Sequence, residues 1–102
     1  MASVRVPQIQ DIETAIRLYY ERIELSNSDI AALFGCSRAT AIKLKRLGKE
    51  QMDADEIPNW NALHVNTRSA FKAWGMDIAD LEQRLKRLRQ LKLRDVQEQQ
   101  AI

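Results

Sequence analysis

Apolar residues recur at helical spacing along most of this chain. Between Ile9 and Arg22 they stand three or four positions apart, which gathers their side chains on one face of a helix. Asp11 and Glu13 occupy the expected first turn, where the helix dipole favours negative charge. The pattern predicts an amphipathic helix here, preceded by an untethered arm over residues 1–7.

A second apolar pattern is interrupted by a glycine. Residues 27–34 place apolar side chains on one helical face, and Gly35 follows, where a helix can end in left-handed backbone. Ser37 then suits the N-cap of a new helix, which we expect to run from Arg38 to Lys49. The apolar residues of this second helix recur three positions apart and form its buried stripe: Ala41, Leu44 and Leu47.

The second half of the chain begins with a break. The acidic segment Lys49–Pro58 predicts a connection, because the residue before a proline is pushed out of helical geometry. Asn66 suits the N-cap of a short helix over Thr67–Trp74. The segment Pro58–Gly75 contains Trp60, Phe71 and Trp74, and we expect the closely spaced Phe71 and Trp74 to lie in the core, with stacking on nucleic-acid bases as the alternative.

The last helix, which we expect to begin after Asp77, carries a short heptad pattern. Its apolar seam consists of Ile78, Leu81, Leu85 and Leu88. The next heptad positions are Lys92 and Asp95, so the seam ends after about two heptads. This helix could pair with its copy in a coiled-coil dimer, or it could lie across the protein's own core. The charged residues beside the narrow stripe favour the dimer.

The segment Asn27–Arg46 resembles the helix-turn-helix of bacterial and phage repressors. The residues that carry the resemblance are apolar or small positions around the turn: Ile30, Ala31, Phe34, Gly35, Cys36, Ala41 and Leu44. The resemblance covers about a fifth of the chain, since a motif of this kind is a two-helix unit. It implies sequence-specific binding of double-stranded DNA, with the second helix in the major groove.

Composition supports a helical fold. Only three glycines and two prolines occur in 102 residues, and apolar residues make up 45% of the chain, which is typical of globular helical proteins. We therefore expect an all-α protein with an N-terminal three-helix helix-turn-helix domain over residues 1–57. Residues 58–102 would hold a short fourth helix and a long C-terminal amphipathic helix.

The distribution of charge adds to the resemblance. A net charge of +2 does not by itself indicate a nucleic-acid partner, but the segment 38–49 holds basic residues and no acidic one. The expected base contacts are Arg38, Ala39 and Ile42. The guanidinium group of Arg38 fits guanine, and the apolar side chains of Ala39 and Ile42 fit a thymine methyl group. The expected phosphate contacts are Ser37, Thr40, Lys43, Lys45 and Arg46.

These features favour a dimeric DNA-binding protein, specifically a bacterial or phage transcriptional regulator. Its expected partners are double-stranded DNA and a second copy of the chain. Two alternatives stay open. The chain could serve phage DNA packaging, recombination or replication, where such a unit is also joined to an oligomerisation helix. It could also be a protein-interaction module that does not bind DNA.

Other classes of function find little support in the sequence. One histidine, one cysteine and no glycine-rich phosphate loop argue against an enzyme, a cofactor or a metal site. The chain has no apolar run of about 18 residues and no signal-peptide pattern. We therefore expect a cytoplasmic protein without a membrane partner.

Overall fold

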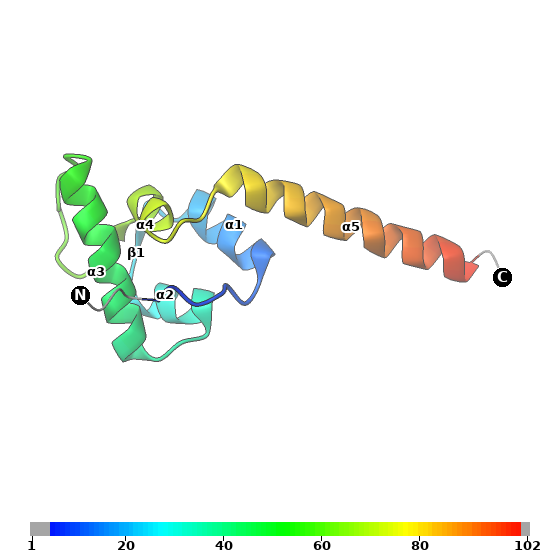
Figure 1. The fold of residues 1–102 in the computed structure, drawn as a ribbon, viewed down its shortest axis with the longest axis horizontal. Coiled ribbons are helices and arrows are strands. Elements are labelled where there is room, and N and C mark those ends of the chain that lie inside the picture. The colour runs from blue at the N-terminus through cyan, green and yellow to red at the C-terminus, as the bar shows by residue number, and fades with distance from the viewer. Residues whose placement is uncertain (1–4, 101–102) are drawn as a thin grey trace.

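The computed structural model describes residues 5–100, and the side chains as far as residue 93. Over this range the chain forms five helices and one two-stranded sheet, in agreement with a mostly helical fold. The elements are α1 (Ile12–Glu21), β1 (Glu24–Leu25), α2 (Asn27–Phe34), α3 (Arg38–Ala54), β2 (Val65–Asn66), α4 (Thr67–Ala73) and α5 (Ile78–Gln100). Four helices and the sheet form a body at one end, and α5 extends away from it (Figure 1).

Side chains at the helix starts explain why the elements begin where they do. Ser26 caps α2 and forms a reciprocal pair of hydrogen bonds with Asp29. Gly35 ends the same helix with φ 61°, as the sequence predicts. Ser37 caps α3, where its Oγ accepts a hydrogen bond from the Thr40 N–H at 3.2 Å, so this predicted N-cap is confirmed.

Helix α3 is longer than predicted. It continues to Ala54, so the connection expected to begin at Lys49 was wrong over its first six residues. The acidic residues there are compatible with a helix, and Met52 is 2% exposed in the core. Burial of that side chain stabilises the additional turn, whereas the acidic composition and the later Pro58 suggested a connection.

One hydrophobic core connects both halves of the chain. Its buried members come from every helix and both strands: Ala15, Leu25, Ile30, Leu33, Phe34, Ala41, Leu44, Met52, Val65, Ala70, Phe71, Trp74 and Leu81. The antiparallel pairs Glu24–Asn66 and Leu25–Val65 form the sheet, which the sequence did not predict. The core therefore includes side chains from both sides of the boundary expected after residue 57.

The described part of the N-terminal arm is tethered, which corrects the expectation for residues 5–7. Val6 and Ile9 pack against the core, and the Gln10 N–H donates to the Leu33 carbonyl at 3.1 Å. Burial of apolar side chains holds this segment in place. Residues 1–4 of the expected arm lie outside the described residues.

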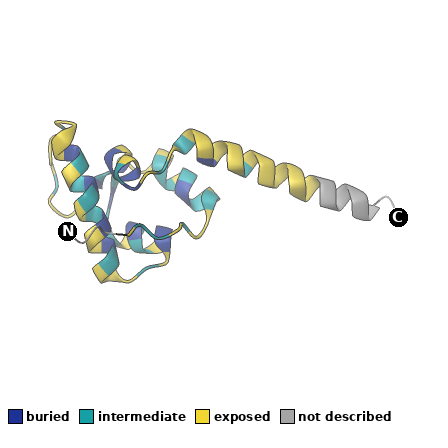
Figure 2. Ribbon diagram, viewed as in Figure 1, coloured by how far each residue is buried: buried dark blue, intermediate teal, exposed yellow. Residues whose placement is uncertain are grey.

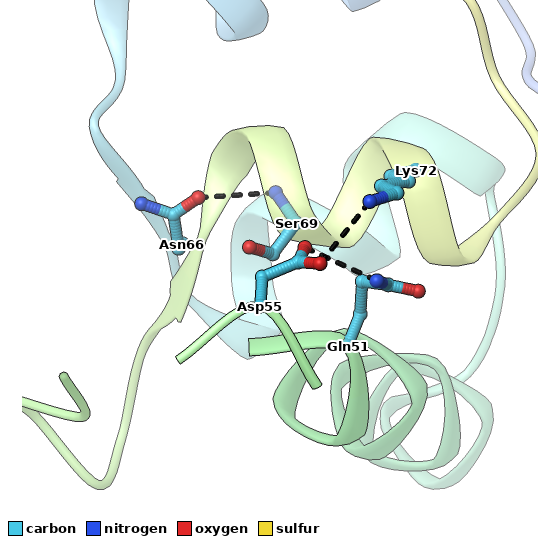
Figure 3. Close-up of polar contacts among 5 residues, drawn as sticks. All are labelled: Gln51, Asp55, Asn66, Ser69 and Lys72. Carbon is cyan, nitrogen blue, oxygen red and sulfur yellow. Dashed lines mark hydrogen bonds and ion pairs between the residues drawn. The ribbon is translucent and has the colours of Figure 1, made fainter. Parts of the chain in front are cut away.

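Polar contacts join the end of α3 to α4. The Asp55 carboxylate accepts hydrogen bonds from the Gln51 amide and from Lys72 Nζ, each at 3.1 Å (Figure 3). Asn66 Oδ1 accepts from the Ser69 N–H at 3.0 Å and caps α4, as the sequence predicts. The bond from Lys72 to Asp55 fixes the end of α3 relative to α4.

The first turns of α5 pack on the body, and the rest extends away. Leu81 is 7% exposed and Ile78 packs against the core, while Leu88 is 45% exposed. The Tyr20 hydroxyl donates to the Glu82 carboxylate and connects α1 to α5. Figure 2 shows the following turns of α5 as exposed. Two of the four residues of the expected dimer seam are therefore occupied by contacts within the chain, because the body lies against that end of the helix.

Candidate nucleic-acid interface

The candidate site is the solvent-facing side of α3, the helix that follows the Gly35 turn in the chain. Six of the eight expected contact residues are exposed: Ser37, Arg38, Ala39, Ile42, Lys43 and Arg46. The other two, Thr40 and Lys45, are half-buried on the flanks of the helix. Ala41 and Leu44 are fully buried on the opposite side. The amphipathic pattern thus anchors one face of α3 in the core and leaves the basic face open.

The cations on this face are not neutralised by neighbouring carboxylates. The ion pairs found among the described side chains join Arg17 to Glu13, Lys72 to Asp55 and Arg84 to Asp80. Among the described side chains, no ion pair involves a basic residue of α3. Their positive charge is therefore free to attract an anionic partner.

The hydroxyl groups of Ser37 and Thr40, at the start of α3, take part in different hydrogen bonds. Ser37 Oγ donates to Thr40 Oγ1 at 3.1 Å and accepts from the Thr40 N–H. The proton of Ser37 is thus donated to Thr40 Oγ1, whereas the hydroxyl proton of Thr40 has no acceptor among the described residues. Thr40 can donate that proton to a phosphate oxygen, and Ser37 holds Thr40 in position.

Charge changes sign along the helix. Lys49 is half-buried, and Glu50 and Asp53 are exposed beyond it. Burial, and secondarily the nearby charge of Lys45, lower the pKa of Lys49. A polyanion is consequently attracted to the first three turns of α3 and repelled by the last ones.

A loop that the sequence did not mark as functional lies beside this helix. Lys49 Nζ donates to Asn59 Oδ1 at 2.5 Å and to the Asn61 carbonyl at 2.8 Å, which pins residues 59–61 to α3. Trp60 in this loop is 85% exposed. Phe71 and Trp74 lie in the core as expected, because they belong to a helix that packs on α3.

A sequence signal for this loop does exist. Trp60 stands between two asparagines and follows a proline, which is the composition of an exposed turn rather than of an apolar helical stripe. An aromatic residue in such surroundings has no periodic apolar neighbours to pack against. That context, more than the ring itself, indicates exposure.

A hollow of about 400 Å³ connects the loop to the start of α3. It is bounded by the N-terminus of α2, by Arg38, and by Leu63 and His64 of the loop. Leu63 is 71% exposed. The loop and the basic face of α3 therefore belong to one continuous surface.

A scan of protein-family models and searches of curated proteins and of solved structures found no significant match to this chain. Within the part of the chain that the structure describes, no group of three or more histidine, cysteine or acidic side chains is placed to hold a metal ion. No helix in that part combines the length and apolar character needed to cross a membrane.

Proposed function

We propose that α2, the Gly35 turn and α3 form a helix-turn-helix that binds double-stranded DNA in a sequence-specific manner. The observation that carries the proposal is the first half of α3, which is anchored by Ala41 and Leu44 and presents unneutralised cations to solvent. A helix of this kind fits the major groove of B-form DNA.

Specificity would come from the outermost residues near the start of α3. Arg38 can donate two hydrogen bonds to the O6 and N7 atoms of a guanine, while Ala39 and Ile42 can contact thymine methyl groups. Lys43 and Arg46 lie farther along the same exposed face and would contact phosphates. The acidic turns beyond Lys49 would keep the far end of α3 away from the DNA backbone.

In this proposal the protein is a dimer and acts as a transcriptional regulator of the bacterial or phage type. Two copies of α3 about 34 Å apart would occupy successive major grooves of an inverted repeat. A role in DNA packaging, recombination or replication uses the same contacts. A ring of many subunits would favour packaging, and a dimer would favour regulation.

The proposal is tested by selecting bound fragments from a random duplex library and measuring their affinity at two salt concentrations. We expect an enriched sequence, an inverted repeat, and affinity that falls steeply with salt. Arg38→Ala should cost about 1–3 kcal/mol on the selected site and relax preference at one base pair. Lys43→Ala should weaken binding to selected and random duplexes alike and reduce the salt slope by about one.

The matched control is Arg17→Ala, which removes an exposed arginine from α1 and the same unit of charge. It should leave affinity nearly unchanged. Equal losses for Arg38→Ala on selected and random DNA would contradict the assigned base contact. The absence of salt-dependent binding would reject the DNA proposal and favour a protein-interaction module, for which the exposed leucines of α5 provide a surface.

A further inference from the structure

The loop between α3 and β2 presents two large apolar side chains to solvent. Trp60 is 85% exposed and Leu63 is 71% exposed. Exposed apolar side chains are common singly, but two within four residues give this short loop an apolar patch. The loop therefore displays apolar surface that the protein's own core does not use.

The loop is held in a defined shape. Besides the two hydrogen bonds from Lys49, the Asn61 Oδ1 atom accepts from the Leu63 N–H at 2.9 Å. The Asn61 amide also lies 2.5 Å from His64 Nδ1, and the His64 N–H donates to the Asn61 carbonyl at 3.2 Å. These contacts reduce the conformational entropy that would be lost when the loop binds a partner.

The chemistry of the loop suits a nucleic acid. No acidic residue occurs from Ile57 to Arg68, so the loop does not repel phosphates, and its polar groups are amides and an imidazole. Leu63 and His64 share the 400 Å³ hollow with Arg38, which places the loop next to the proposed base-reading residue. Lys49, a cation that could have faced solvent, instead fixes the loop to the same helix.

We propose that residues 59–64 form a second contact with the DNA duplex that α3 binds. Trp60 and Leu63 insert against bases and sugars in the groove beside the one that α3 occupies. Apolar wedges of this type contact the minor groove and partly unstack neighbouring base pairs. This inference rests on the proposed DNA binding of α3 and extends the contact beyond that helix.

Intrinsic fluorescence provides a direct test, because the chain has only two tryptophans and Trp74 is 5% exposed. Titration of the full chain with its selected duplex should quench and shift the emission of Trp60. Trp60→Phe keeps an aromatic ring and removes this signal, so the difference between the two titrations isolates Trp60. Trp60→Ala should lower affinity by about 5- to 150-fold, the range measured for loss of a stacked aromatic side chain.

Ile23→Ala is the matched control, since it removes an apolar side chain that is 84% exposed between α1 and β1, outside the loop. It should leave affinity and Trp60 quenching unchanged. If the wild-type protein binds DNA without quenching of Trp60, Arg38→Ala weakens binding and Trp60→Ala leaves the affinity unchanged, the loop contact is refuted while DNA binding by α3 stands. If Trp60→Ala changes the sedimentation mass instead of the affinity for DNA, the patch is a contact between copies and the inference is overturned. If no variant and no duplex gives binding, both proposals fail.

Discussion

At the scale of single residues, Gly48 decides how closely α3 approaches β2 and α4. A Cβ atom at this position would lie 2.6 Å from Val65 Cγ2 and 3.2 Å from the Ala70 side chain. Both neighbours are fully buried, so neither can move aside without disturbing the core. The glycine is therefore required for packing between segments about 20 residues apart, although it sits inside a helix.

Gly48→Ala tests this interpretation because two effects oppose each other. Replacing glycine by alanine in a helix interior should stabilise α3 by about 1 kcal/mol. Overpacking against Val65 should cost about 1–3 kcal/mol, so we expect a net loss of stability in urea unfolding. A gain in stability would show that α3 and α4 can separate enough to hold the additional methyl group.

At the scale of elements, the end of α3 is coupled to α4 through one carboxylate. Hydrogen bonds from Gln51, and then from Lys72, lower the pKa of Asp55 below its ordinary range. A carboxylate whose pKa is lower in the folded chain than in the unfolded chain stabilises the fold above the unfolded pKa, about 4. That contribution is lost as the pH falls through the folded pKa.

Asp55→Asn should therefore lower the melting temperature at pH 7 and have little effect at a pH below the lowered pKa. Asparagine keeps one acceptor oxygen but carries no charge for Lys72. Asp53→Asn is the control, because its carboxylate makes no hydrogen bond or ion pair among the described residues. A pH-independent difference between wild type and Asp55→Asn would mean that ionisation of Asp55 does not contribute to stability.

At the scale of the whole molecule, α5 gives the protein its length. The extents are 57 × 24 × 24 Å, and most of the long dimension comes from the helix that leaves the body (Figure 1). An isolated helix of this kind is marginally stable in water without packing. Leu88, Leu91 and Leu93 are all about half or more exposed, and in the proposed dimer they would pack against the second copy of the chain.

If the chain forms the proposed dimer, Leu88→Asp is expected to convert it to a monomer in sedimentation while leaving the body folded. A buried charge in the seam costs several kcal/mol, whereas the body holds α5 through Ile78 and Leu81 rather than through Leu88. Gln83→Asp places the same charge at another exposed position of α5 and should leave the dimer intact. A dimer that survives Leu88→Asp would move the interface to another surface.

Local features of this protein follow from its sequence. The caps at Ser37 and Asn66 and the left-handed turn at Gly35 depend on a side chain and its own neighbouring backbone, so short patterns predict them. The basic stretch and the buried stripe of α3 are likewise local, because helical periodicity alone separates the two faces.

Contacts between distant segments were decided by the tertiary structure. The Thr67 hydroxyl donates to the Arg22 carbonyl 45 residues away, beside the β1–β2 pair, and no local pattern encodes that meeting. The extension of α3 past Lys49 depends in the same way on the burial of Met52 in the core. Sequence periodicity specifies which side of a helix is apolar, but only the packed chain specifies which surface covers it. That is why Ile78 and Leu81 belong to the body and Trp60 does not.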